Sequence, residues 1–246
     1  MDWLEITAIG MIAGVLGNGI GGLFSFFIRK TSTRFMGTIL GFSAGVMLSI
    51  IFLELLQESM DYSGHWYSVA GIFIGLVAFF ILDFYIPHHH AVTSEESYKG
   101  DFLKKGILLA IGISFHNLPE GLAIGVGFRG SLELGLTLSF LIALHNIPEG
   151  MAVAVSLKYG GYPLSRVLAI TALSGVPMGI GALAGALIGV ISPVILGLLF
   201  GFAAGAMLYI VCDELIPDAY QSAGAHFSIL GIFFGVAVGI IFSASL

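Results

Sequence analysis

The chain has 246 residues, of which 57% are hydrophobic and 10% are charged, and its formal net charge at pH 7 is −6. An ordinary soluble domain has about 25% charged residues, so this composition predicts an integral membrane protein. No basic stretch indicates nucleic-acid binding, and the single cysteine, Cys212, excludes an intrachain disulfide framework or a thiolate metal cluster.

Eight apolar stretches are long enough to cross a bilayer, because a transmembrane helix needs about 20 predominantly apolar residues. In chain order they cover residues 3–28, 35–56, 66–86, 106–128, 132–157, 164–190, 194–216 and 226–244. The sequence therefore predicts an all-α integral membrane protein, with eight transmembrane helices in a single transmembrane domain, 1–246.

One long polar segment, residues 87–105, separates the third and fourth predicted helices and carries three consecutive histidines, His88, His89 and His90. Lys and Arg are enriched in cytoplasmic loops. Eight of the nine Lys and Arg residues flank the joints after the first, third and fifth predicted helices, and only Arg129 lies opposite. This bias predicts that the histidine-bearing loop is cytoplasmic and that both termini lie outside the cytoplasm.

The first and last thirds of the chain resemble each other. GFSAGVMLSIIFLELL at 41–56 matches GFAAGAMLYIVCDELI at 201–216, and YSVAGIFIG at 67–75 matches FSILGIFFG at 227–235, both at a spacing of 160 residues. Counterparts are five predicted helices apart, an odd number, so the two copies are inverted across the membrane. The expected arrangement is 3+2+3, with a repeat in 1–86, the loop 87–105, a two-helix hairpin in 106–157 and the inverted repeat in 164–246. Inverted repeats of this kind are typical of secondary transporters.

The predicted hairpin contains one polar motif twice, HNLPEG from His116 and HNIPEG from His145. Residues four apart share a helix face, so each histidine is expected to lie over the glutamate of its own motif. The motif proline cannot donate a backbone hydrogen bond, which favours a kink. The candidate metal ligands are His116, Asn117, Glu120, His145, Asn146 and Glu149.

A charged carboxylate at the centre of a bilayer costs about 2.5–3.5 kcal/mol, and Glu120 and Glu149 cannot compensate each other. A shared divalent cation would compensate both, and imidazole, amide and carboxylate groups suit Zn²⁺, Fe²⁺ or Mn²⁺ better than Ca²⁺ or Mg²⁺. The alternative is that these polar side chains only hydrogen-bond across packed helices. The duplication of the whole triplet favours metal binding.

With these two motifs the chain resembles the ZIP (Zrt/Irt-like protein) family of divalent metal transporters, and in particular its compact bacterial branch. The resemblance covers the whole chain. It implies transport toward the cytoplasm across the cell membrane, along a pathway lined by the second, fourth, fifth and seventh helices. It also implies a centre for one or two metal ions at mid-membrane, with the six candidates as ligands and Glu120 and Glu149 able to bridge two ions. Zn²⁺ or another divalent metal, iron, manganese or cadmium included, is then the transported substrate, and no cofactor is expected.

The chain departs from this family pattern in the sixth predicted helix. Many members have a glutamate there, in a pattern like SGxxEP, whereas this chain has SGVPMG at 174–179. A single-metal or weakly binuclear site is therefore expected. Glu54 and Glu214 occupy matching repeat positions and are either pathway acids or ordinary residues at helix ends.

Two other functions remain as alternatives. An intramembrane metalloenzyme is disfavoured because the chain has no HExxH motif and no Ser or Cys nucleophile constellation, so we expect that it is not an enzyme. A metal-selective channel is disfavoured by the inverted repeat. The expected partners are divalent metal ions and the lipid bilayer, without nucleic acid, and a homodimer is left open.

Overall fold

The computed structural model describes residues 1–27, 33–85, 98–189 and 192–244, and over these residues the chain is helical apart from short turns and caps. The α-helices are α1 (Trp3–Phe24), α2 (Thr33–Ser49), α3 (Leu56–Tyr85), α4 (Tyr98–Gly130), α5 (Leu132–Tyr159), α6 (Leu164–Leu173), α7 (Pro177–Ile188), α8 (Pro193–Ile210) and α9 (Ile216–Ser243). Two π-helical turns join neighbouring helices, η1 (Ile50–Leu55) between α2 and α3 and η2 (Val211–Leu215) between α8 and α9. The predicted all-α fold is confirmed over the described residues.

Side-chain caps mark the starts of three helices. Asp2 Oδ1 accepts a hydrogen bond from Glu5 N at 2.8 Å, and Glu5 Oε2 accepts one from Asp2 N at 2.9 Å, which closes a capping box at the start of α1. The hydroxyl oxygens of Ser131 and Ser192 accept from the backbone N–H three residues later, at 3.0 Å and 3.2 Å. These bonds satisfy backbone donors that the first turn of a helix leaves unpaired.

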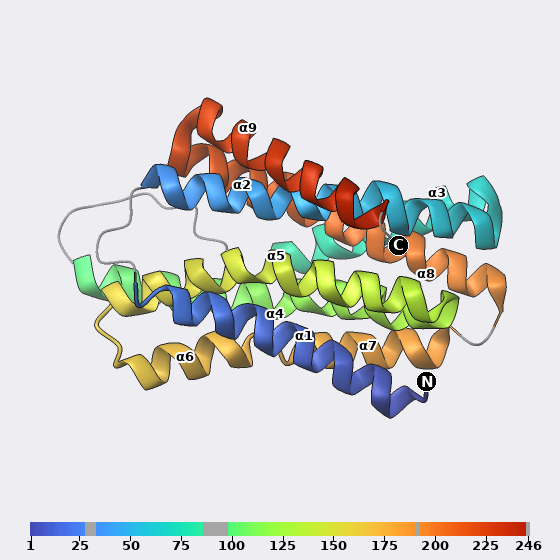
Figure 1. Ribbon diagram of the computed structural model, residues 1–246, viewed down its shortest axis with the longest axis horizontal. Coiled ribbons are helices and arrows are strands. Elements are labelled where there is room, and N and C mark those ends of the chain that lie inside the picture. The colour runs from blue at the N-terminus through green and yellow to red at the C-terminus, as the bar shows by residue number, and fades with distance from the viewer. Residues whose placement is uncertain (28–32, 86–97, 190–191, 245–246) are drawn as a thin grey trace.

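The helices form two layers that run along the long axis of the molecule (Figure 1). One layer consists of α2, α3, α8 and α9, with α2 packed along α9 and α3 along α8. The other consists of α1, α4, α5, α6 and α7, in which α4 packs on α5 and α7 while α1 packs on α5 and α7. The layers meet where α2 contacts α5 and where α4 contacts α8.

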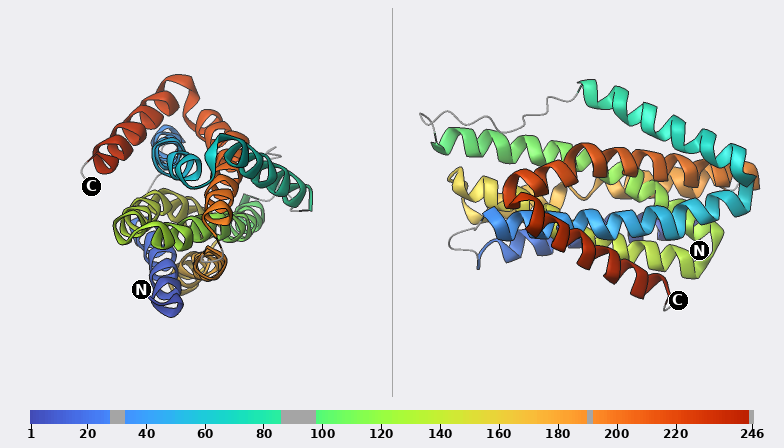
Figure 2. Two further views of the ribbon diagram at one scale, coloured as in Figure 1. Left: turned by 90° about the vertical axis from the view of Figure 1, so that its right-hand side faces the viewer. Right: turned by 90° about the horizontal axis from the view of Figure 1, so that it is seen from above.

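The chain reverses direction within α3 and within α9, at Gly64 and Gly224 (Figure 2). Gly64 has φ 75° and ψ 168°, and Gly224 has φ 72° and ψ 169°. This backbone conformation is essentially restricted to glycine. The two glycines are 160 positions apart, which is the spacing of the sequence repeat, and η1 and η2 also lie at corresponding places in the two copies.

Two boundaries differ from the sequence predictions. The run expected over 164–190 is divided into α6 and α7 by a turn at 174–176, because Pro177 has no backbone N–H to continue the ladder of α6 and instead begins α7. Helix α4 begins at Tyr98 rather than at 106, so part of the segment expected to be a loop is helical. A helix satisfies its backbone hydrogen bonds internally and can therefore continue from an apolar into a polar stretch. The histidines His88–His90 lie outside the described residues.

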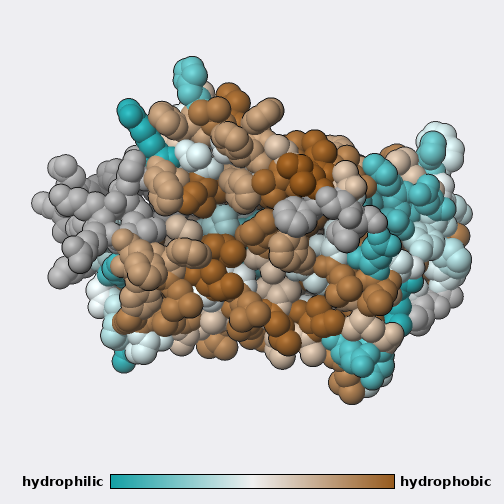
Figure 3. All heavy atoms as spheres, viewed as in Figure 1, coloured by the Kyte–Doolittle hydropathy of each residue, from teal (hydrophilic) through white to brown (hydrophobic). Residues whose placement is uncertain are grey.

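On the face shown in Figure 3, apolar residues cover the middle and hydrophilic residues gather toward the ends. Six stretches of the described chain are long and apolar enough to cross a membrane. They are Trp3–Phe24, Gly37–Ile81, Leu109–Gly130, Leu132–Tyr159, Leu164–Ile188 and Pro193–Ile241. The structure therefore supports a multi-pass membrane protein.

The ends of the described chain lie at the same end of the long axis, near the joint between α4 and α5 (Figures 1 and 2). The joint between α5 and α6 lies at the opposite end, where α2 and α4 begin. The two ends of the molecule are therefore distinct: one holds the ends of the described chain, and the other holds the starts of α2 and α4 and the joint between α5 and α6.

Candidate metal centre

The two copies of the motif lie on α4 and α5, which pack against each other in the interior. Both helices continue through their prolines, Pro119 and Pro148, so the expected kink does not interrupt either one. All six candidate ligands are buried, with exposures of 6% or less. The sequence motif therefore places two carboxylates and two imidazoles in the apolar interior, where charge needs compensation.

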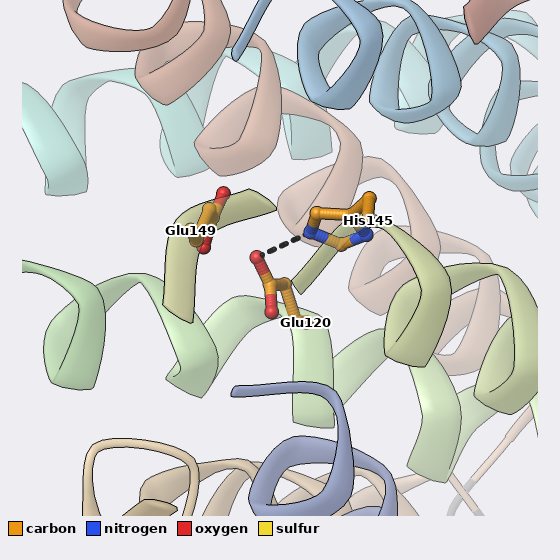
Figure 4. A group of neighbouring side chains, drawn as sticks. All are labelled: Glu120, His145 and Glu149. Atoms are coloured by element: carbon orange, nitrogen blue, oxygen red, sulfur yellow. Dashed lines mark hydrogen bonds and ion pairs between the residues drawn. The ribbon is translucent and has the colours of Figure 1, made fainter. Parts of the chain in front are cut away.

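Three of the candidates converge on one point: Glu120 from α4 and His145 and Glu149 from α5 (Figure 4). One ligand atom from each lies within 4.8 Å of the others, and His145 Nε2 is 3.1 Å from Glu120 Oε1. Zinc ligands at 2.0–2.1 Å in tetrahedral geometry are about 3.3 Å apart. The separation of His145 Nε2 and Glu120 Oε1 is therefore close to that of two ligands on one zinc ion.

The carboxylates of this group are left with unpaired oxygens. Glu120 Oε2 and both carboxylate oxygens of Glu149 are buried without a hydrogen-bond partner. A buried ionised acceptor without a partner is strongly unfavourable. Two carboxylates and one imidazole together match a divalent transition-metal ion in both charge and donor type.

His116 lies elsewhere, with Glu214. Its Nε2 is 3.0 Å from Glu214 Oε2 of η2, and so it reaches from α4 to the other layer rather than to Glu120. His145 also does not pair with the glutamate of its own motif, as was expected, but with Glu120 of the other helix. Sequence spacing identified these residues but not their partners, because the contacts between α4, α5 and η2 are set by packing.

The asparagines form a separate group of hydrogen bonds. Asn146 Nδ2 donates to Asn117 Oδ1 at 3.1 Å, and Asn117 Nδ2 donates to the carbonyl oxygen of Ser174 at 2.8 Å. Asn18 of α1, which is fully buried, also lies in this group, with its side chain 3.1 Å from Ser174 Oγ. Neither Asn18 nor Ser174 was among the site residues predicted from the sequence, although an asparagine within the apolar first stretch was a usable signal.

The glycines that end the two motifs allow other helices to approach closely. A Cβ on Gly150 would lie 2.7 Å from Asn18 Cα, and a Cβ on Gly121 would overlap the carbonyl oxygen of Met178 in α7. Helices α1 and α7 therefore pack backbone to backbone against the motifs. This contact places Asn18 beside the α5 motif.

Met178 lies in the segment SGVPMG, where many members of the family have a glutamate and this chain has none. It is buried in the hydrophobic core, in the part of the chain where a carboxylate was found to be missing. Neither α6 nor α7 contains an Asp or Glu. Met47 and Met207, which occupy matching positions of the repeat, are fully buried in the same core cluster.

Comparison with known proteins gives one consistent result. Residues 94–243 match the family described as ZIP Zinc transporter. The chain is 38% identical to the zinc transporter ZupT of Nitratidesulfovibrio vulgaris over 250 residues, which cover 91% of this chain and 90% of that protein. It is 36% identical to ZupT of Akkermansia muciniphila over 255 residues, covering 95% and 94%, and 33% identical to ZupT of Clostridium perfringens over 260 residues, covering 93% and 91%. The resemblance inferred from the paired motifs is thus confirmed, and the chain belongs to the ZIP zinc transporter family.

Proposed function

We propose that this chain transports divalent transition-metal ions, zinc first among them, across a cell membrane toward the cytoplasm. The observation that carries the proposal is the buried group of Glu120, His145 and Glu149, whose ligand atoms lie within 4.8 Å of one another. Its donors suit Zn²⁺, Fe²⁺, Mn²⁺ and Cd²⁺, and the transporters named above as relatives support zinc. An ion is the substrate of such a site and leaves again, so the protein acts as a transporter rather than as an enzyme.

The proposed topology has eight membrane crossings in a 3+2+3 arrangement. Two of the apolar stretches are 45 and 49 residues long, and a straight helix of that length would be about twice as long as the hydrocarbon core is thick. Each stretch contains one of the reversals at Gly64 and Gly224, which supports two crossings apiece. The common location of the termini, opposite the joint between α5 and α6, supports the orientation with both termini outside.

The proposed pathway runs between the two layers, past His116. The contact between His116 and Glu214 joins α4 to η2 within this interface, which supports a role for Glu214 as a pathway acid. A histidine paired with a carboxylate can exchange that partner for a passing cation. Of the two remaining candidates, Asn146 offers a buried oxygen, Oδ1, without a hydrogen-bond partner, whereas the Asn117 oxygen accepts a hydrogen bond from Asn146 Nδ2 and would have to exchange it for an ion.

The test is uptake of radiolabelled Zn²⁺ into proteoliposomes that contain the native protein, Glu120→Ala or Glu149→Ala. We expect saturable uptake by the native protein and its loss in both variants, because each variant removes a charged ligand from the buried site. Glu133→Ala is the matched control, since Glu133 lies exposed in the first turn of the same helix as Glu149. Native uptake rates in both site variants would refute the proposal, and competition by Fe²⁺, Mn²⁺ and Cd²⁺ would rank the substrates.

The same assay separates a transporter from a metal-selective channel. Alternation between two states limits the rate of a transporter, so uptake saturates as the Zn²⁺ concentration rises. Flux through an open channel remains close to linear over a much wider range. We expect saturation because the inverted repeat and the midplane site are typical of secondary transporters.

A further inference from the structure

Three buried asparagines from three helices meet at the break between α6 and α7. They are Asn18 of α1, Asn117 of α4 and Asn146 of α5, and each is fully buried. The carbonyl oxygen of Ser174, in the turn between α6 and α7, accepts a hydrogen bond from Asn117 Nδ2. Buried amides in an apolar interior need such partners, so this group has a defined arrangement.

Asn18 holds this group together from the side of α1. In the amide orientation that satisfies both ends of the Asn18 side chain, its oxygen accepts from Gly175 N at 3.2 Å and from Asn117 Nδ2 at 3.3 Å, and its nitrogen donates to the backbone oxygen of Asn146 at 3.1 Å. One side chain therefore contacts the helix break, the α4 motif and the α5 motif.

The direction of these hydrogen bonds follows from the Ser174 carbonyl. A carbonyl oxygen only accepts, so Asn117 must turn its NH₂ toward Ser174, and its own oxygen is then available to accept from Asn146 Nδ2. Asn146 Oδ1 is therefore the last atom in this series of hydrogen bonds, and it is buried without a partner of its own. Glu149, with two unpaired oxygens, lies three residues further along α5, on the same side of the helix.

We propose that Asn18 is a positioning residue of the metal centre, which acts with the Ser174 carbonyl to keep Asn146 Oδ1 free to bind the ion held by Glu149. This inference rests on the proposed function, because it assigns a role in ion binding to residues outside the cluster of carboxylates and histidine. The lack of any acid on α6 and α7 is consistent with it, since a neutral amide oxygen supplies the ligand on that side. The centre then binds an ion through two carboxylates, one imidazole and one oriented amide.

The experiment measures zinc uptake for Asn18→Leu, which is close in shape to asparagine but cannot hydrogen-bond, and for Asn18→Ala, which adds no bulk. We expect the KM for Zn²⁺ to rise by about 10- to 100-fold in both, as is typical when a partner that orients a metal ligand is removed. Because Asn18 acts through Asn146, a double variant that combines an Asn18 substitution with Asn146→Ala should have the same KM as Asn146→Ala alone.

Ser59→Ala is the matched control, because the Ser59 hydroxyl is also buried and donates to the carbonyl oxygen of Gly197 at 2.7 Å, between α3 and α8. It should lower the thermal midpoint and leave KM unchanged. Native KM values in both Asn18 variants, or a full additional rise in KM in the Asn146→Ala background, would overturn the inference. If Glu120→Ala and Glu149→Ala abolish uptake in the same experiment, the proposed function stands even when this inference fails.

Discussion

Glu120 and His145 belong to different helices, yet their side chains are fully buried and 3.1 Å apart. Together with Glu149 they place up to two negative charges in the interior, with one imidazole beside them. Each ionised group is unfavourable there unless a partner of opposite charge is present. At the scale of residues, the chemistry of the site is therefore an excess of negative charge that a divalent cation relieves.

This excess predicts that zinc stabilises the folded protein. A ligand at 100 times its Kd adds about 2.7 kcal/mol to the free energy of unfolding. We expect Zn²⁺ to raise the thermal midpoint of the detergent-solubilised protein, and Glu149→Gln to remove most of this rise by removing a ligand charge. Glu133→Gln should respond to zinc like the native protein. An equal rise in Glu149→Gln would show that zinc binds elsewhere.

The His116–Glu214 contact predicts coupling between the two layers. Glu214→Gln leaves the buried His116 poorly satisfied and His116→Gln leaves the partly buried Glu214 poorly satisfied, and each should destabilise the protein by about 1–3 kcal/mol. The double variant should lose clearly less than the two single losses combined, because both changes act on one contact. Thermal midpoints of the four proteins measure this, with Glu54→Gln, the repeat counterpart in η1, as the control. Strictly additive losses would mean that the contact contributes nothing.

The composition of the candidate site could be predicted from the sequence, but its geometry could not. Duplication of His, Asn and Glu in two apolar stretches identified all three residues of the cluster in Figure 4. The exchange of partners between His145 and Glu120 depends on how α4 and α5 are rotated against each other, which motif spacing does not specify. Asn18 was missed because a single asparagine carries no repeated pattern, and its partners are distant in sequence.

At the scale of elements, the two reversals depend on single glycines. Gly64 and Gly224 have positive φ, and a Cβ on either would have no neighbour within 4 Å. Substitution by alanine therefore strains only the backbone, by about 1–3 kcal/mol. We expect Gly64→Ala and Gly224→Ala each to lower the thermal midpoint.

Gly112→Ala is the control for these variants, because Gly112 lies within α4 with open space around it and has no positive φ. Alanine is the better helix former, so this variant should be as stable as the native protein or slightly more stable. Equal midpoints for all four proteins would show that the reversals do not require glycine.

Apolar runs located most of the helices, because the length of a crossing is fixed by the bilayer. They did not locate the break at 174–176 or the start of α4 at Tyr98. In the apolar stretch that contains this break, the residue least compatible with a continuous helix is Pro177. Proline is nevertheless tolerated in transmembrane helices when neighbours satisfy the freed backbone groups, so its presence did not predict a break. Asn117 satisfies the Ser174 carbonyl here, and this contact is visible only in the folded protein.

At the scale of the whole molecule, the orientation in the membrane can be tested with single cysteines. In a Cys212→Ser background, Asp2→Cys should react with a membrane-impermeant maleimide added to intact cells, because the N-terminus is expected outside. Ser165→Cys, exposed at the start of α6, should react only after permeabilisation. The opposite labelling pattern would invert the proposed direction of transport.

The pairing of α2 with α9 and of α3 with α8 has a consequence for biosynthesis. The second and third helices leave the ribosome more than 100 residues before the helices they pack against. Until then, the backbone of Gly45, which lies against α9 in the folded protein, faces lipid or another protein. This layer can therefore close only when the last helix has been inserted, while α4 and α5 can already be in contact.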